Sequence, residues 1–428
     1  MIQSLLQNKE DNQKMKKFLA LVMAAVMTLS LAACGGKEEP APEASGSASN
    51  SSNEDFKVGA IYITSQSDAA GYTHQHHTGI TTAMKNLGMD VDSQLLIVDK
   101  VPEDHTAVCN AIDTLAGQGA DIIFGISFDY LDAMNDKAAE YPEIMFSHAT
   151  GYMNNDTNFN NYFGRIYQAR YLTGIAAGMK SLELGNNEVG YVAAWNTEYA
   201  ETCSGINAFA LGVQSVNPEA TVHVNKISTW GDENLERQAA QTLIDTYKVG
   251  VVAQHCDSAQ PQLVAAQNGV YGCGYNSDMT EQAPDNHLTA AIWHWDVYYE
   301  TAIKAAMSCN GDASKFVDAM GGNAYYAGLA EKFVDASPLN EKAAAPNTQA
   351  VMDAVRELIV SGDWDVFSGV KLSYDIAEDG SVEIIKTDAD LVDNQGNVIV
   401  AAGEGSVEDA VIKGSMNYNV AGVDAPQA

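Results

Sequence analysis

Basic residues are scarce in this 428-residue sequence. It has 23 lysines and arginines against 56 aspartates and glutamates, which gives a formal net charge of −33. A chain of this charge repels phosphate backbones and anionic lipid head groups, so we expect no nucleic-acid partner. The scattered acidity is typical of a solvated surface and does not by itself indicate a ligand.

Catalytic motifs are also missing. The sequence contains no GxxxxGK[ST] phosphate loop and no GxSxG nucleophile elbow. The run His255-Cys256-Asp257 cannot form a relay, because adjacent residues on a strand point to opposite faces. We therefore expect a protein that is not an enzyme.

Metal ligands and disulfide frameworks are poorly represented. His74 and His77 could share a metal at helical spacing, but no Cys or His at an established ligand spacing completes a site, so we expect no metal and no cofactor. His76 or His77 is then interpreted as pocket lining or a solvated helix face. The cysteines after Cys34 are odd in number, which favours buried free thiols, although a bridge between Cys256 and Cys273 stays open.

An export signal is present near the N-terminus. Residues 15–34 contain two lysines, an apolar run and small residues before Cys34, as a secretory signal peptide does. The apolar run of about 13 residues is short for a membrane span, which needs about 20. The segment LAAC at 31–34 resembles the lipobox of bacterial lipoproteins, whose cysteine carries a lipid. We expect a signal peptide with a lipobox at 1–34 and a flexible tether at 35–55, with the protein extracytoplasmic and held at the cell membrane only by a lipid on Cys34.

Strand-like runs alternate with helical segments from residue 56 onward, which predicts parallel sheets with crossover helices. The expected strands are residues 58–63, 91–98, 122–126, 144–147, 189–193, 221–225, 249–254, 270–275 and 288–293. This number exceeds one small sheet, and residues 161–178 interrupt the alternation, so we expect two α/β domains. A helix at 346–360 and a hairpin formed by 366–374 and 381–385 are expected to cap the second one.

The first of these units, residues 56–79, places a polar loop between a buried strand and a helix that begins near Tyr72. In open α/β sheets ligands bind beyond the carboxyl ends of the strands. Asp68 and Tyr72 therefore become candidate ligand contacts.

Aromatic and acidic side chains recur after the later strands. They are Phe128, Trp195, Trp230 with Asp232, His255 with Asp257, Asn276 with Asp278, and Trp293 with Trp295. Aromatic faces stack on flat rings and carboxylates accept hydrogen bonds from ring or sugar donors, so this set suits a heteroaromatic ligand better than catalysis.

Several separated motifs carry a family resemblance. They are SDAAGYTHQHHTG (67–79), FSHATGY (146–152), NYFGRIYQARYLTG (161–174), VGYVAAW (189–195), GINAFALGVQSVNP (205–218), STWGDENLERQAAQTLID (228–245), QHCDS (254–258) and GYNSDM (274–279). In this order they resemble the basic membrane protein family of lipoproteins, which are substrate-binding components of ABC transporters related to purine nucleoside binding proteins. The resemblance extends over most of residues 56–423.

The resemblance implies a type I periplasmic-binding-protein fold, with two α/β lobes of parallel sheets that close on a ligand by a hinge. Lobe 1 would comprise residues 56–165 with a returning segment at about 290–320, and lobe 2 residues 166–289 with a C-terminal segment at about 321–428. The ligand contacts implied or considered are Asp68, Tyr72, Phe128, Arg165, Trp195, Trp230, Asp257, Asp278 and Trp293.

One departure affects the ligand. Members that bind nucleosides often carry a lysine after the strand that here reads LTAAIWHW, where His294 or a tryptophan replaces it. A free base such as adenine thus rivals a purine nucleoside. The function expected is capture of a purine for an ABC permease and ATPase. A signalling lipoprotein and a secreted nucleoside hydrolase are the alternatives.

Overall fold

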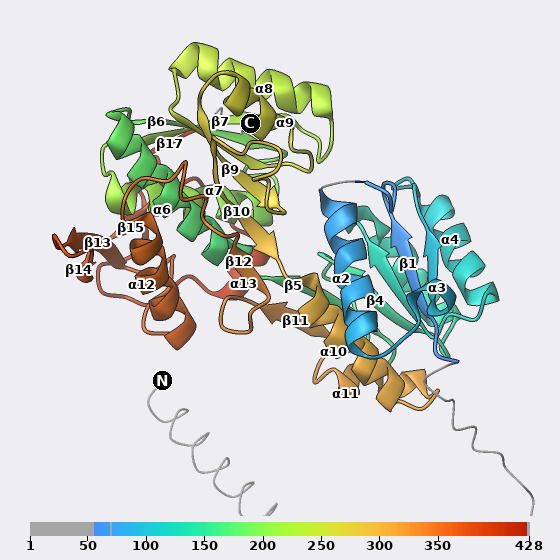
Figure 1. Cartoon of the computed structure of the whole chain (residues 1–428). Helices are drawn as coiled ribbons and strands as arrows, with labels where there is room; N and C mark the ends of the chain where they lie inside the picture. The colour runs from blue at the N-terminus through green and yellow to red at the C-terminus, as the bar shows by residue number, and fades with distance from the viewer. Residues whose placement is uncertain (1–54, 69–70, 426–428) are drawn as a thin grey trace, which may run out of the picture. The chain divides into compact units, whose positions relative to one another are not determined.

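The computed structural model describes residues 55–68 and 71–425 (Figure 1). The expected signal peptide, Cys34 and all of the tether except Asp55 lie outside the described residues. The described residues form one compact unit that is built around two sheets with helices on their faces. No helix of the described ranges is long and apolar enough to cross a membrane.

The first sheet is entirely parallel, as buried strands with helical crossovers require. Its strands, in spatial order, are β11 (Ala324–Ala327), β5 (Phe159–Gly164), β4 (Met145–Ala149), β3 (Ile122–Ile126), β1 (Val58–Tyr62) and β2 (Leu95–Val98). Its helices are α2 (Tyr72–Asn86), α3 (Val91–Gln94), α4 (His105–Gly117), α5 (Leu131–Glu140), α10 (Trp295–Ser308) and α11 (Phe316–Ala319).

The second sheet is parallel except for the antiparallel strand β12 at one edge. Its strands, in spatial order, are β12 (Val334–Ala336), β10 (His287–Trp293), β9 (Tyr271–Asn276), β8 (Val251–His255), β6 (Glu188–Ala193), β7 (Thr221–Lys226) and β17 (Val423–Asp424). Its helices are α6 (Ile166–Leu184), α7 (Ala200–Val216), α8 (Glu233–Tyr247) and α9 (Gln260–Gln267).

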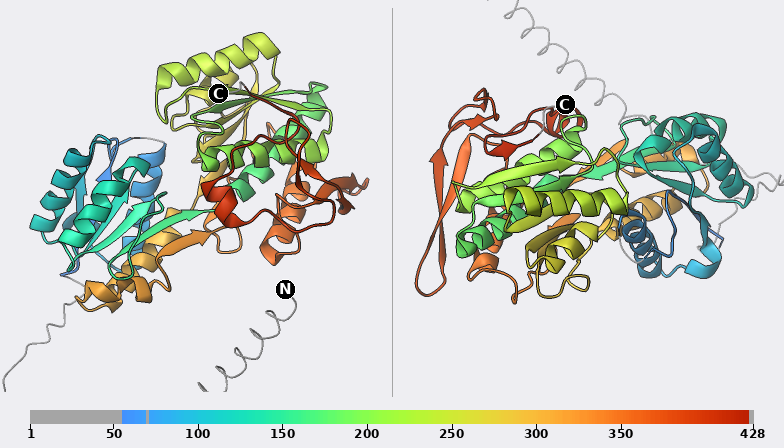
Figure 2. Two further views of the ribbon diagram at one scale, coloured as in Figure 1. Left: turned by 180° about the vertical axis from the view of Figure 1, so that it is seen from behind. Right: turned by 90° about the horizontal axis from the view of Figure 1, so that it is seen from above.

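The C-terminal region packs against this second sheet and its helices (Figures 1 and 2). It contains α12 (Thr348–Ser361), the hairpin β13 (Val370–Ile376) and β14 (Val382–Asp388), the short pair β15 (Leu391–Val392) and β16 (Val398–Val400), and α13 (Asp409–Gly414). Both the helix and the hairpin expected here from the sequence are present.

The chain passes between the two sheets three times. It leaves the first sheet between β5 and α6, returns between β10 and α10, and leaves again between β11 and β12. In Figure 1, α10 lies beside α2 of the first sheet, and Tyr299 of α10 bonds the hydroxyl of Tyr162 in β5 at 2.7 Å.

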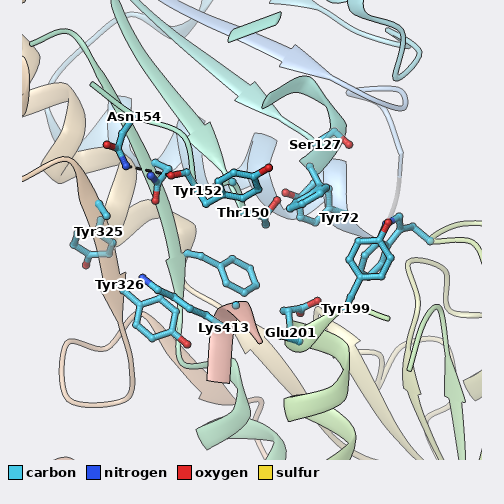
Figure 3. A pocket seen from close by; sticks show the side chains of 18 of the residues that line it. Tyr72, Ser127, Thr150, Tyr152, Asn154, Tyr199, Glu201, Tyr325, Tyr326 and Lys413 are labelled. Atoms are coloured by element: carbon cyan, nitrogen blue, oxygen red, sulfur yellow. Dashed lines mark hydrogen bonds between the residues drawn. The ribbon is translucent and has the colours of Figure 1, made fainter. Parts of the chain in front are cut away.

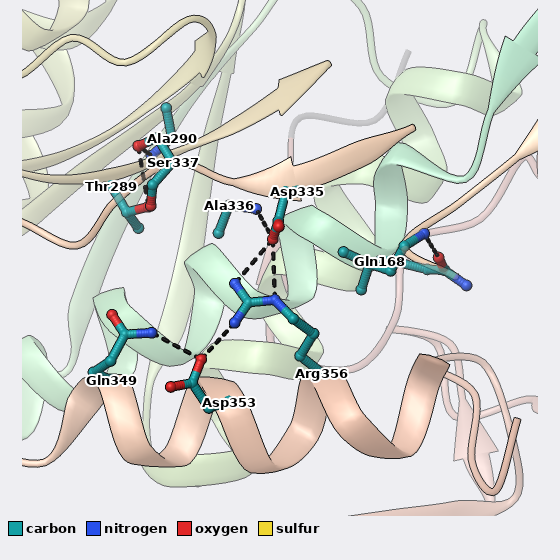
Figure 4. A network of polar contacts seen from close by, with 10 residues as sticks. Gln168, Thr289, Ala290, Asp335, Ala336, Ser337, Gln349, Asp353 and Arg356 are labelled. Carbon is teal, nitrogen blue, oxygen red and sulfur yellow. Dashed lines mark hydrogen bonds and ion pairs between the residues drawn. The ribbon is translucent and has the colours of Figure 1, made fainter. Parts of the chain in front are cut away.

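Polar contacts hold β12, the strand that the chain enters after its third passage between the sheets (Figure 4). Arg356 of α12 donates from Nε and Nη2 to Asp335 Oδ1 of β12, at 3.1 and 2.9 Å. On the other side, Ser337 Oγ accepts from the backbone N–H of Ala290 in β10 at 2.9 Å. The crossing strand is therefore held by both neighbours.

We call the first sheet with its helices the first lobe and the second sheet with its helices the second lobe. In the second lobe, α6 and α7 approach each other closely. Gly174 of α6 faces Gly212 of α7, and a Cβ on Gly174 would lie 2.2 Å from the carbonyl oxygen of Phe209. A Cβ on Gly212 would meet the carbonyl oxygen of Tyr171 at the same distance. Only glycine allows this backbone contact.

Two expectations about strands are corrected. The strand expected at 91–98 starts only at Leu95, because Asp90 caps a helical turn and accepts from the Asp92 N–H at 3.2 Å. The strand β5 was not expected, since asparagine has a low strand propensity. In β5, Asn160 is fully buried and donates to the Tyr298 hydroxyl at 3.1 Å, so tertiary contacts override that propensity.

The histidines of α2 also differ from their interpretation as pocket lining or solvated face. His76 is fully buried, stacks on Trp295 at a centroid distance of 4.0 Å and bonds the Tyr299 hydroxyl at 2.6 Å. His77 bonds the Tyr62 hydroxyl at 3.2 Å. Their role is to join α2 to its neighbours.

Candidate functional site

A cavity of about 680 Å³ lies at the carboxyl ends of the parallel strands of both sheets (Figure 3). This is the position at which open α/β sheets bind ligands, because the loops after the strands converge there. The first sheet contributes the segments after β1, β3 and β4, and the second those after β6, β7 and β8. Loops from both lobes therefore reach one cavity.

Four of the predicted contacts line this cavity. Tyr72 and Phe128 come from the first lobe, and Trp230 and Asp257 come from the second. Tyr72 opens α2 directly after Gly71, whose φ of 91° is in the left-handed region. A Cβ at Gly71 would lie 2.4 Å from the carbonyl oxygen of Asp257, so this glycine lets the two loops touch.

The other five predicted contacts lie behind or beside the lining. Trp293 is buried and donates from its indole to the Tyr275 hydroxyl at 3.3 Å, and Trp195 packs on Tyr199 at 5.1 Å between centroids. Both thus support residues that line the cavity. Asp278 accepts from the Thr280 hydroxyl at 2.6 Å and shapes its own loop.

Asp68 and Arg165 complete this set. Asp68 lies in the turn after β1, where its N–H donates to the Ser65 carbonyl at 3.1 Å. Arg165 pairs with Asp409 of α13, from Nη2 to Oδ2, at 2.6 Å, and its guanidinium lies 5.1 Å from the centroid of Tyr326. Neither residue lines the cavity.

Aromatic rings from both lobes line the cavity. Tyr199 contacts Phe128 of the first lobe at 5.9 Å and Trp230 of its own lobe at 6.0 Å between centroids. Tyr275 and Tyr326 add further rings. Flat faces from both lobes therefore surround the space, which suits a flat ligand.

Two carboxylates of the second lobe, Glu198 and Glu201, differ in what they offer. Both line the cavity at the start of α7. Glu198 forms an ion pair with Lys226 and accepts from the Asn196 N–H at 3.0 Å, so its charge is already compensated. Glu201 instead accepts from His255 Nε2 at 2.9 Å and keeps lone pairs for a ligand.

His255 and Arg170 lie behind Glu201. Burial and the nearby guanidinium of Arg170 lower the pKa of His255 to about 4, so the imidazole is neutral and donates from Nε2. Arg170 is almost fully buried, stacks on Tyr275 at 4.1 Å and donates from Nη1 to the Gln254 carbonyl at 2.9 Å. The N–H of His255 thus fixes one oxygen of Glu201, and the other oxygen is left to accept from a ligand.

Asp257 is the most perturbed carboxyl of the lining. Burial, and secondarily the carboxylate of Glu236, raise its pKa to about 8, while Asn276 donates to Oδ1 at 3.3 Å and acts in the opposite direction. Near pH 7 this carboxyl is mostly protonated and can both donate and accept.

The raised pKa predicts a pH-dependent stability. A carboxyl that must ionise in a buried site costs free energy of folding as the pH rises from its unfolded pKa, near 3.9, toward about 8. Between pH 6.5 and 8 we expect the free energy of unfolding to fall by about 1 kcal/mol per pH unit, less than the full value of about 1.4 because the folded carboxyl is itself about half ionised at pH 8. Urea unfolding at both pH values measures this, and Asp257→Asn should flatten the slope. An unchanged slope in the variant would contradict the assignment.

The sequence reasoning missed Glu201, Tyr199, Tyr275, Tyr326 and Lys413. Glu201 follows β6 in a strand-loop-helix unit like the one that contains Asp68. Its position after a strand could therefore have identified it as a candidate ligand contact. Lys413 lies in α13, where no sequence pattern indicated a site. Within the part of the chain that the structure describes, no three His, Cys, Asp or Glu side chains could hold a metal, and all five cysteines are free.

Comparison with known proteins gives a consistent assignment. The model of the family "ABC transporter substrate-binding protein PnrA-like" matches residues 56–362. A purine-binding protein of Brucella abortus is 32% identical over 371 residues, which is 87% of this chain and 93% of that protein. A putative ABC transporter glucose-binding protein of Haloferax volcanii is 41% identical over 196 residues, 46% of this chain and 48% of that protein.

Solved structures agree on the fold. A solute-binding protein of an ABC transporter system from Conexibacter woesei aligns with a TM-score of 0.57 at 19% identity, covering 72% of this chain and 98% of its own. One from Aeropyrum pernix aligns with a TM-score of 0.58 at 16% identity, covering 76% and 95%. The predicted periplasmic-binding-protein fold is thereby confirmed.

Proposed function

Because this chain belongs to the PnrA-like family of ABC transporter substrate-binding proteins, and is therefore a binding protein rather than an enzyme, we propose that it captures a purine and delivers it to a permease. The family membership expected from the motifs is confirmed. Solute-binding proteins of ABC transporters work outside the cytoplasm. The partners that we propose are a small-molecule ligand and the permease and ATPase subunits of the transporter.

The observation that carries the proposal is the lining of the cavity. Aromatic rings from both lobes surround it, and Glu201 presents a carboxylate whose opposite oxygen is fixed by His255. A purine has a flat face for Tyr72 or Trp230 and N–H donors for Glu201. The relative from Brucella abortus, named as a purine-binding protein, supports the same ligand class.

Contact with both lobes would couple binding to closure. A ligand that touches Tyr72 on one lobe and Trp230 on the other gains part of its affinity only when the lobes approach. The contact of Gly71 with Asp257 shows how closely the two loops can lie. Binding energy would thus favour the form that a permease recognises.

The direct test is calorimetric titration of the purified protein with adenine, adenosine, inosine and glucose. We expect saturable binding of at least one purine and none of glucose. Glucose is a specific rival ligand, because the Haloferax volcanii protein that matches part of this chain is named as a putative glucose-binding protein. Binding of glucose alone would replace the purine assignment. Mass spectrometry of small molecules that co-purify identifies a retained ligand independently.

Trp230→Ala should weaken purine binding more than about tenfold, because it removes one aromatic face of the cavity, worth about 1.4 kcal/mol or more. Trp230→Phe keeps a flat face and should stay within about threefold. Calorimetry of both variants measures the difference. Equal affinity of Trp230→Ala and the unchanged protein would remove Trp230 from the ligand site.

Anchoring belongs to the proposal as well. The layout of residues 15–34 supports a lipid on Cys34. Cell fractionation should then find the protein with the membrane, and recovery of the full-length mature chain in the soluble fraction would argue against the anchor. A signalling role in place of transport is the alternative, and capture of the permease by the ligand-bound protein distinguishes the two.

A further inference from the structure

Part of the ligand cavity is built by a segment outside the region that matches the family. The family match ends at residue 362, whereas Ala410, Lys413 and Gly414 of α13 line the cavity. This helix lies within the C-terminal region that returns toward α7 after the hairpin β13–β14. The wall at α13 is thus a feature that the family match does not explain.

The position of α13 is fixed by specific contacts. Arg165, at the crossing between β5 and α6, pairs with Asp409 through two bonds, Nε to Oδ1 at 3.1 Å and Nη2 to Oδ2 at 2.6 Å. Arg165 also donates to the Tyr326 carbonyl at 3.2 Å. On the inner face of α13, Ile412 is buried at 1% exposure. The helix is therefore anchored where the chain passes between the lobes.

In this arrangement the ammonium group of Lys413 has no carboxylate partner among the described residues. Its nearest acidic neighbour along the helix, Asp409, is occupied by Arg165, and among the described residues no carboxylate forms an ion pair with Lys413. Its ammonium lies 4.7 Å from the centroid of Tyr326. A cation that is held by an aromatic face keeps its N–H donors for another partner.

The polar groups of the cavity are separated by charge. Figure 3 shows Lys413, Tyr326 and Asn154 on one side and Glu201 and Tyr199 on the other. A ligand that satisfies both sides carries N–H donors at one end and oxygen acceptors at the other. A bare purine carries its donors and acceptors on one small ring system, and a cavity of about 680 Å³ has room for a further substituent beside that ring.

We propose that Lys413 is a specificity-determining residue that donates hydrogen bonds to the hydroxyl groups of a sugar-like substituent on the ligand. This inference rests on the proposed purine function. A neutral, hydroxylated substituent fits better than a phosphate, because the carboxylate of Glu201 lines the same cavity and repels an anion. The C-terminal segment would then select nucleosides over bare bases.

Calorimetry with adenine, adenosine and adenosine monophosphate tests this assignment on the whole protein and on Lys413→Met, which keeps the length of the side chain. We expect the variant to bind adenosine about tenfold more weakly and adenine within twofold of the unchanged protein. Lys371→Met removes an exposed lysine of β13 that does not line the cavity, and it should leave both affinities unchanged.

Three results would overturn the assignment of Lys413. They are an equal loss for adenine and adenosine, no loss for either, and the tightest binding by the monophosphate. If the unchanged protein binds none of the three ligands, the purine function itself fails and the inference falls with it. If adenine binds normally and only the effect of Lys413→Met is absent, the purine function stands and the inference alone is wrong.

Discussion

Glu201→Gln is expected to weaken purine binding about a hundredfold. The substitution preserves the size of the side chain and an oxygen that accepts from His255 Nε2, so the local structure should survive. It removes the negative charge that faces the cavity. Hydrogen bonds to charged groups contribute about 1.5–3 kcal/mol, and the upper part of this range corresponds to about two orders of magnitude in affinity.

The matched control is Glu198→Gln. Both glutamates line the cavity at the start of α7, but Glu198 is paired with Lys226 and its charge is not free for a ligand. We expect this variant to bind within about threefold of the unchanged protein. Calorimetry at pH 7 on both variants gives the comparison, and a larger loss for Glu198→Gln would reverse the roles assigned to the two carboxylates.

Gly174→Ala is expected to destabilise the protein by about 3 kcal/mol and to lower its melting temperature by roughly 5 °C. The added methyl group would lie 2.2 Å from the carbonyl oxygen of Phe209, and its next neighbours are also backbone atoms of α7. Backbone atoms cannot rotate away as a flexible side chain can. The two helices must therefore separate, which opens the packing between α6 and α7.

Gly117→Ala provides the control for this substitution. Gly117 ends α4, and no atom lies within 4 Å of a Cβ placed on it. Alanine favours helix over glycine, so this variant should be neutral or more stable by up to about 1 kcal/mol. Differential scanning calorimetry of both variants separates steric strain from propensity. A Gly174→Ala protein as stable as Gly117→Ala would refute the close helix contact.

The sequence predicts the fold well where a continuous apolar run begins and ends with a strand. Runs such as 122–126 and 189–193 are buried on both faces, and this burial is what a continuous apolar run reports. The predicted start of the strand at 91–98 was wrong, because the first apolar residues of this run lie in a capped helical turn. The strand β5 failed for the opposite reason, since the partners of Asn160 come from α10, far away in the sequence.

The candidate site was predictable only in part, for a similar reason. Tyr72, Phe128, Trp230 and Asp257 follow strands, so the rule for open α/β sheets finds them. Arg165 also stands at a strand end, but its partner Asp409 lies 244 residues later and turns it toward α13. No local pattern reports such a partner.

The short strand β17 determines when the second sheet can be completed during folding. Val423 and Asp424 cover the edge of β7, where Val222 donates to the Gly422 carbonyl at 2.9 Å. During synthesis on the ribosome this edge stays open until residues 422–424 have been joined. A product that stops before residue 422 would expose unpaired N–H and C=O groups of β7, which are a template for pairing with other chains. The strand β17 thus protects the edge of a sheet whose first strand, β6, precedes it by more than 200 residues.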